Sequence, residues 1–157
     1  MCRIVGRLTG VCNWRDTEYV RDYQEKYLGR RDGNTFLTEV LPLPKRSTGS
    51  WPYDALWPTK DEYERSVLGD RIDMLRELRR HHTPRYTFCY GKGFWDHHKH
   101  IFKERRFRPL IENDAEISVE NASVVVLTRF FEPTYQGFTI DFIGELCTAV
   151  ISDMEGM

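Results

Sequence analysis

Residues 35–53, TFLTEVLPLPKRSTGSWPY, decide how the rest of the chain is interpreted. The stretch begins with an apolar run at residues 36–41 and then breaks at Pro42 and Pro44. The run is short, rich in residues that favour β-structure, and preceded by Gly33-Asn34, which favours a strand over a helix. Because apolar and polar residues hardly alternate in it, the strand is expected to be covered on both faces. The sequence therefore predicts a buried strand that ends in a loop.

Glu39 stands out as a carboxylate near the end of this expected strand. A buried carboxylate is costly to desolvate unless it is paired, so Glu39 is expected to have a hydrogen-bond partner. One interpretation is a structural partner, such as an arginine or a helix N-terminus. The other is that Glu39 faces a ligand at the carboxyl end of the sheet, where open α/β folds place their sites.

The composition is that of a globular protein with one core. The chain has 157 residues, of which 40% are hydrophobic and 30% charged, and its net charge is −1. A single domain spanning residues 1–157 is expected, and any nucleic-acid binding must come from a local basic patch. The sequence shows no signal peptide, membrane span or repeat. Four widely spaced cysteines without a CxxC motif indicate reduced thiols, so a cytoplasmic location without membrane contact is expected.

Helices and strands are expected to alternate along the chain. Residues 1–5 are interpreted as a strand or a mere lead-in, and residues 115–119 as an extra edge strand. The other expected elements are helix 16–28, a helix from Thr59 that ends in residues 79–82, strand 86–90, helix 94–103, strand 122–127 and helix 139–152. This alternation predicts parallel strands joined by right-handed crossovers. The expected fold class is α/β, a three-layer α/β/α sandwich with a mostly parallel central sheet.

The order of four segments resembles a known family. Residues 3–10, RIVGRLTG, are similar to a V-G-R-x-G segment, and residues 36–44 to a strand that ends in an Asn and a Pro-Pro loop. Residues 71–91 are similar to a helix followed by P-x-x-V-x-x-x-G, and residues 124–133 occupy the place of a second catalytic motif. Over residues 3–151 the chain thus resembles the uracil-DNA glycosylase superfamily, most closely its family-4-like and uncharacterised branches.

Two motifs of that family depart from the expected pattern. The motif that carries the water-positioning group is missing, so the first strand and this motif are expected to lie before Met1 or to be lost. Thr128 and the three residues after it stand where the family has His-Pro-Ser, without a histidine. No cysteine has the spacing of an iron–sulfur ligand set, so no cofactor is expected.

The resemblance implies a DNA glycosylase, which flips a base into a pocket and hydrolyses its N-glycosidic bond. Glu39 holds the position of the Asn that reads uracil in the family, and an alignment slip of one residue would place Thr38 there instead. An ionised carboxylate only accepts hydrogen bonds, so Glu39 suits the N4 amine of a cytosine-type base and repels the O4 of uracil. A modified or damaged cytosine is the expected substrate, with roles in antiphage defence or base-excision repair.

Catalytic and substrate-binding roles are expected for a small set of residues. Arg129 would stabilise the leaving base, contact a phosphate, or pair with Glu132. Asp16 is the other candidate catalytic group, as a general base. The expected substrate-binding residues are Glu39, Pro42, Trp51, Tyr53, Phe130 and Phe131. The two phenylalanines would fill the gap left by a flipped base or pack in the core, and Trp51 and Tyr53 would stack on the base or anchor the loop.

DNA is the expected partner, through basic loops. Lys45, Arg46 and Ser47 suit phosphate contacts, although a solvated loop would look the same. Lys92 joins this set, even though its Gly-Lys-Gly segment lacks the spacing of a phosphate loop. A zinc site at the histidines of residues 97–100 is rejected, because adjacent histidines point to different faces of a helix.

Two further functions are weighed against the glycosylase. One is an inactive module of the same fold that binds DNA or a protein partner, which the missing first motif favours. The other is a different α/β hydrolase or nucleotide-binding domain, against which stands the absence of GxSxG, Walker and GxGxxG motifs.

Overall fold

The computed structural model describes residues 1–43, 51–130 and 140–156. Along the chain the elements are α1 (Cys2–Leu8), α2 (Thr17–Lys26), α3 (Lys60–His81), β1 (Tyr86–Tyr90), η1 (Lys92–Phe94), α4 (Trp95–Ile101), β2 (Arg108–Ile111), β3 (Ala115–Glu120), β4 (Ser123–Thr128) and α5 (Ile140–Glu155). The predicted helix from Thr59, strands 86–90 and 122–127 and the C-terminal helix are confirmed within a few residues. The fold is mixed α/β.

The start of α3 follows directly from its local sequence. The Thr59 side chain accepts a hydrogen bond from the Glu62 backbone N–H at 3.2 Å, and the Glu62 carboxylate accepts one from the Thr59 N–H at 3.3 Å. This capping box satisfies two N–H groups that have no partner inside the helix. The N-terminus of α3 is therefore specified by residues only three positions apart.

The sheet contains four described strands in the order β1-β4-β3-β2. β1 pairs with β4 in parallel, whereas β4 with β3 and β3 with β2 are antiparallel. The prediction of a mostly parallel sheet is therefore wrong. A two-residue turn at Asn121 and Ala122, both at positive φ, joins β3 to β4, and so short a turn can only connect antiparallel strands. β3 is confirmed as a strand but is internal rather than at the edge.

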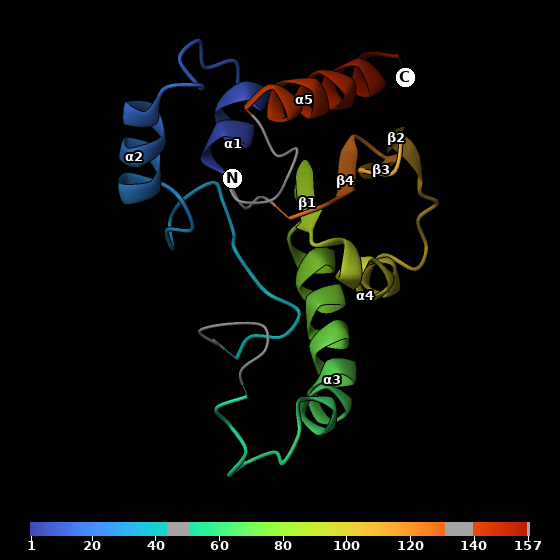
Figure 1. Cartoon of the computed structure of the whole chain (residues 1–157). Helices are drawn as coiled ribbons and strands as arrows, with labels where there is room; N and C mark the ends of the chain where they lie inside the picture. Colours follow the sequence, from blue (N-terminus) through green and yellow to red (C-terminus); the bar gives the residue numbers. More distant parts are fainter. Residues whose placement is uncertain (44–50, 131–139, 157) are drawn as a thin grey trace.

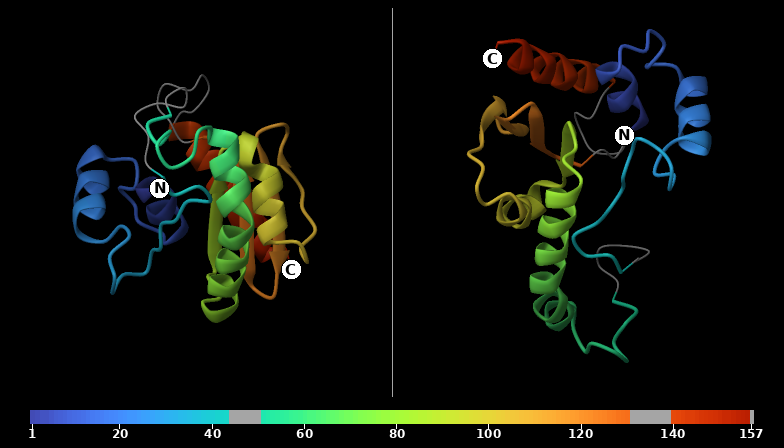
Figure 2. Two further views of the ribbon diagram at one scale, coloured as in Figure 1. Left: turned by 90° about the horizontal axis from the view of Figure 1, so that it is seen from below. Right: turned by 180° about the vertical axis from the view of Figure 1, so that it is seen from behind.

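Helices pack against both faces of the sheet (Figures 1 and 2). On one face, Val125 and Leu127 of β4 contact Leu75 of α3 and Ile101 of α4. On the other face, the alternate β4 residues Val124 and Val126 contact α5 through Phe142, Leu146 and Val150. β4 is buried along its whole length, which explains its uninterrupted apolar sequence.

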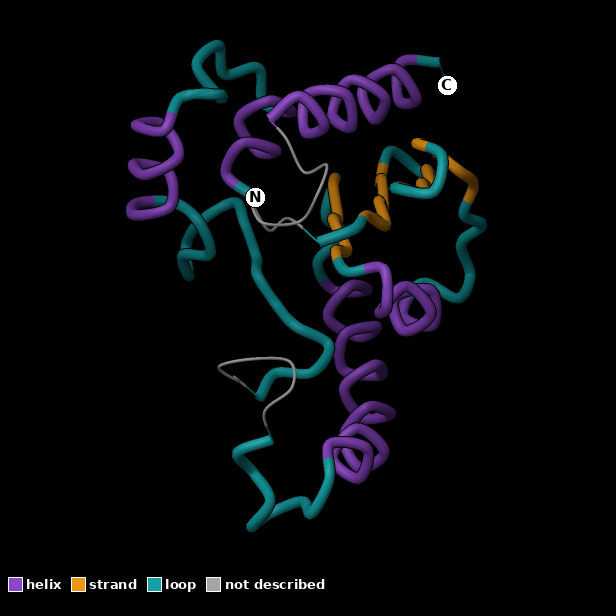
Figure 3. The backbone as a smooth tube through the Cα atoms, viewed as in Figure 1, coloured by secondary structure: helices purple, strands orange, loops and turns teal. Residues whose placement is uncertain are grey.

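The predicted strand at residues 36–41 is not formed, and this segment is part of a long loop (Figure 3). Phe36 is 69% exposed, and Val40 is the residue of this run that enters the core. Arg71 of α3 donates hydrogen bonds to the Glu39 carbonyl at 3.0 and 2.8 Å, so this carbonyl is satisfied without a neighbouring strand. The loop is thus tied to α3 rather than paired in the sheet.

The N-terminal residues form α1 rather than the strand or lead-in that the sequence predicts. Ile4 is buried against Ile143 and Cys147 of α5. At Gly6, an added Cβ would lie 2.7 Å from the Tyr19 ring, so only glycine permits this close approach of α2. Tertiary packing on α5 and α2 therefore decides the conformation of this short segment.

Candidate site at the carboxyl ends of β1 and β4

The parallel pairing of β1 with β4 brings two chain segments to one edge of the sheet. Tyr90 lies opposite Thr128, so residues after both positions emerge side by side. The Gly91 N–H donates to the Thr128 carbonyl at 2.9 Å, and the Trp95 indole N–H donates to the same oxygen at 3.1 Å. These bonds hold the start of η1 and α4 against the end of β4. In open α/β folds ligands bind at such an edge.

An aromatic pair stands at this edge. The Tyr90 and Phe130 rings lie 6.1 Å apart between centroids at an interplanar angle of 64°. Gly91 has a φ of 98°, and an added Cβ there would lie 2.9 Å from the Phe130 ring. Glycine is therefore required both by the backbone conformation and by the ring beside it. Tyr90 is 36% exposed, so part of this aromatic residue is accessible to solvent at the edge.

Glu39 reaches this edge from the loop rather than from a strand. Burial raises the pKa of Tyr90, and the negative charge of Glu39 raises it further, which places this carboxylate near the tyrosine. The neighbouring Thr38 hydroxyl accepts a hydrogen bond from Arg71 at 2.7 Å. Glu39 itself is exposed, and so is Pro42 farther along the loop. The expectation that Glu39 is buried is therefore wrong.

Arg129 is anchored by residues that the sequence did not indicate. Its guanidinium lies 3.3 Å from the Asp114 carboxylate and 4.5 Å above the Phe142 ring. Its side chain is only 15% exposed. The partner considered from the sequence, Glu132, lies outside the described residues. The turn between β2 and β3 thus contributes the Asp114 carboxylate to this edge. The pairing of Asp114 with Arg129 could not be predicted from a short-range sequence pattern.

Lys92 also lies at the edge. Its ammonium group donates to the Asn113 carbonyl at 2.9 Å and stands 5.7 Å from the centre of the Trp95 ring. Lys92 is exposed. The β2–β3 turn thus holds the ammonium group of Lys92 in place, and this exposed positive charge can interact with an anion at the edge.

A neutral histidine lies beneath the edge. Burial lowers the pKa of His98 to about 4. A hydrogen bond with the Tyr90 backbone raises the pKa, but by less than burial lowers it. The His97 charge lowers the pKa slightly further. At neutral pH the imidazole is uncharged, so it supports the end of β1 and adds no charge to the site. Across residues 1–43, 51–130 and 140–156, no group of three or more histidine, cysteine or acidic side chains could hold a metal ion.

Other predicted residues lie elsewhere. Asp16 is exposed at the start of α2, which lies beside α1 and away from the strands in Figures 1 and 2. Trp51 donates to the Trp57 carbonyl at 2.6 Å, and its ring packs on Tyr53 and Tyr63, each at 5.5 Å. These contacts agree with the anchoring interpretation of Trp51 and Tyr53. The predicted residues that lie outside the described ranges are Lys45, Arg46, Ser47 and Phe131.

No family model, curated protein or solved structure matches the chain. None of the helices in the described ranges has the length and apolar content needed to cross a bilayer.

Proposed function

We propose that the protein is a DNA glycosylase that acts on a cytosine-type base and is a divergent relative of the uracil-DNA glycosylase superfamily, with DNA as its partner. The proposal includes a glycosylase-like layering of helices on both faces of the sheet. What supports it is the order of the sequence segments together with one geometric observation. Tyr90, Lys92 and Phe130, from two distant parts of the chain, lie at the same edge of the sheet, and the negative charge of Glu39 acts on Tyr90.

Each of these residues has a role in the proposed complex. The aromatic surface of Tyr90 and Phe130 stacks on a flipped base, which is a sequence-tolerant source of binding energy. Glu39 accepts a hydrogen bond from the exocyclic amine of that base. Lys92 contacts a flanking phosphate. Arg129, held by Asp114 and Phe142, contributes positive potential toward the departing base anion.

The second candidate is a module of the same fold that binds DNA without cleaving it. One observation favours it over the enzyme: the predicted base Asp16 lies away from the sheet edge. Asp114, a carboxylate at the edge, is already paired with Arg129. Among the described residues, a glycosylase built on this site would use Glu39 or Asp114 to position the attacking water, whereas a binding module requires neither.

The test is alkaline cleavage of oligonucleotides after incubation with the protein. Substrates carry uracil, cytosine, 5-hydroxymethylcytosine or its glucosylated form. We expect alkali-labile abasic sites only with a cytosine-type base. In the Glu39→Gln variant an amide replaces the carboxylate, and because an amide both donates and accepts, preference should shift toward uracil by about tenfold or more.

Glu25→Gln is the matched control, because Glu25 is an exposed glutamate on α2, away from the edge. It should leave the base preference unchanged. Cleavage of uracil alone by the unmodified protein would contradict the role of Glu39. Binding of single-stranded DNA without any abasic product would select the non-catalytic module.

A further inference from the structure

A separate hollow lies at the opposite, amino-terminal edge of the same two strands. It has a volume of about 200 Å³ and is lined by Thr87 of β1, Ser123 of β4 and residues from the end of α3. Three arginines line it, Arg79, Arg80 and Arg105, and none of its lining residues is acidic. We refer to it as the arginine hollow. It shares no residue with the site at the carboxyl edge.

Arg105 is fixed in the wall of the hollow. Its side chain is 8% exposed, and its guanidinium donates to the Ser123 carbonyl at 3.0 Å and the Ser118 carbonyl at 3.4 Å. The Glu120 carboxylate lies 3.9 Å from its Nε, beyond ordinary hydrogen-bond distance. The charge of Arg105 is thus held at the β3–β4 hairpin by carbonyl groups, and the Glu120 carboxylate lies beyond hydrogen-bond distance of its Nε.

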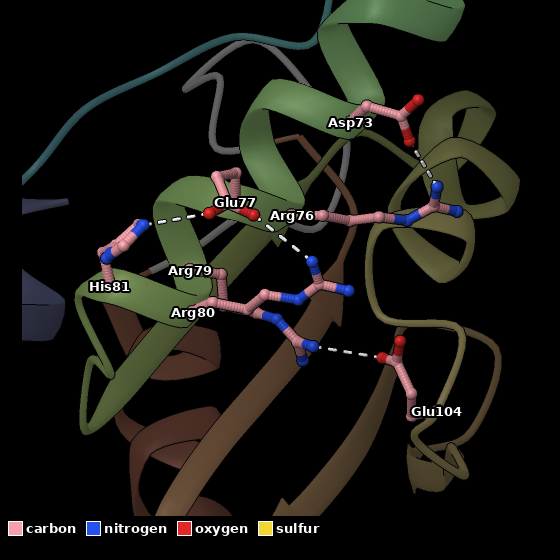
Figure 4. Close-up of polar contacts among 7 residues, drawn as sticks. All are labelled: Asp73, Arg76, Glu77, Arg79, Arg80, His81 and Glu104. Carbon is pink, nitrogen blue, oxygen red and sulfur yellow. Dashed lines mark hydrogen bonds and ion pairs between the residues drawn. The ribbon is translucent and has the colours of Figure 1, made fainter.

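Arg79 faces the hollow with donor capacity to spare. Its guanidinium lies 5.1 Å from the centre of the Phe102 ring, and one terminal nitrogen bonds Glu104 at 3.0 Å (Figure 4). Its Nε is buried and has no hydrogen-bond partner within the described part of the chain. A buried N–H without a partner costs free energy.

The charges in the hollow also favour an anion. Burial lowers the pKa of Arg105 and the neighbouring Arg79 charge lowers it further, while Glu120 and Glu104 oppose these effects. Arg80 pairs with Glu77 at 3.2 Å (Figure 4), and the side chains of Glu77 and Glu104 are about half exposed. Such solvent-exposed pairs contribute little to stability, so a bound anion competes with them readily.

We propose that the arginine hollow binds a phosphate group. The planar fork of a guanidinium matches the oxygens of phosphate bidentately, and three such forks surround this hollow. The hydroxyls of Thr83 and Thr87, which also line it, are further donors. The phosphate belongs either to a free nucleotide or to a nucleic-acid backbone. This site is independent of the proposed glycosylase activity.

The test is titration of the full chain with inorganic phosphate, followed by two-dimensional NMR of backbone amides and arginine Nε–H groups. Potassium chloride at equal ionic strength is the reference. We expect saturable shifts confined to residues 79–87, 102–105 and 118–123, with the Arg79 Nε–H among the most strongly shifted. Shifts that do not saturate, or that potassium chloride reproduces, would overturn the proposal.

Two variants locate the binding. Arg80→Gln removes an exposed side chain and should leave the fold intact while weakening phosphate binding about tenfold. Arg79→Lys keeps the charge but loses the fork, and should also weaken binding. Arg65→Gln, an exposed arginine near the other end of α3, is the matched control and should bind like the unmodified protein. Equal weakening by Arg65→Gln would refute a specific site.

Two further ligands identify the source of the phosphate. A nucleoside 5′-monophosphate that binds more tightly than inorganic phosphate, and loses this affinity in Arg80→Gln, identifies a nucleotide site. A short oligothymidylate whose binding is weakened by Arg80→Gln, together with a mononucleotide that binds no better than phosphate, identifies a backbone contact. If Arg80→Gln and Arg65→Gln bind inorganic phosphate, the mononucleotide and the oligothymidylate with equal affinity, the proposal fails.

Discussion

The four cysteines differ in burial: one thiol is exposed to solvent and three are buried. Cys2, Cys89 and Cys147 are buried and Cys12 is exposed, and all four are free. Burial raises the pKa of both Cys89 and Cys147 to about 12, so these thiols stay protonated and unreactive near neutral pH. We expect a thiol-specific colorimetric reagent to modify one cysteine rapidly in the native protein. Cys12→Ser should remove this fast phase, and rapid reaction of a second thiol would contradict the assignment.

His98 should make the stability of the protein depend on pH. Its pKa is about 4 in the folded protein and 6.5 as a free side chain. Between pH 4 and 6.5 the unfolded chain binds a proton at His98 that the folded chain does not. The neutral His98 therefore contributes its full share to the free energy of unfolding above pH 6.5. This contribution is lost as the pH falls toward 4 and amounts to about 3 kcal/mol at most.

Two measurements check this prediction. Urea unfolding of His98→Gln should show a weaker loss of stability between neutral and mildly acidic pH than the unmodified protein shows. The NMR signal of the His98 ring should not titrate near neutral pH. A titration midpoint close to the ordinary histidine value would show that the imidazole is accessible to water in the folded protein.

At the scale of single elements, α3 depends on the cap at its first turn. Thr59→Ala removes the hydroxyl that accepts the Glu62 N–H and should lower the free energy of unfolding by about 1 kcal/mol. Thr59→Ser retains an oxygen acceptor and should cost much less. Urea unfolding followed by circular dichroism measures both. A loss of equal size in the serine variant would assign the effect to the threonine methyl group instead.

The strand pairing is decided by a turn that carries only a weak sequence signal. Asn121 tolerates positive φ, whereas Ala122 rarely adopts it, so the pair lacks the Asn-Gly pattern that usually marks a two-residue hairpin. The apolar run at residues 123–127 was evident in the sequence, but the direction of its neighbours depends on this turn. The sequence therefore predicts that β4 is a strand, but it does not predict that β4 pairs with β3 in an antiparallel arrangement.

At the scale of the whole molecule, β4 joins the cores on the two faces of the sheet. Leu127 is fully buried between α3, α4 and β1, so Leu127→Ala should lower the free energy of unfolding by about 2–5 kcal/mol. Leu56, which is 71% exposed, is the matched control, and Leu56→Ala should change it by less than about 0.5 kcal/mol. Urea unfolding midpoints compare the two. Similar losses would mean that Leu56 is covered in solution.

The sequence by itself determined the features that depend on near neighbours in the chain. The helical spacing after Thr59 and the apolar run at residues 124–127 are local patterns, and the structure contains both of them. These predictions succeeded because capping and periodic burial are set by residues a few positions apart.

Tertiary structure alone decided what depends on distant partners. The apolar run at residues 36–41 is a loop, and Arg71, more than 30 positions away, binds the Glu39 carbonyl in place of a neighbouring strand. Arg129 is held by Asp114 from another turn, and Asp16 is carried away from the site by the packing of α2 on α1. The arginine hollow exists only where α3, the β3–β4 hairpin and the segment after α4 converge. The physical reason is the same in each case: hydrogen bonds and charges are satisfied by whichever group folding brings near, and sequence separation does not encode that distance.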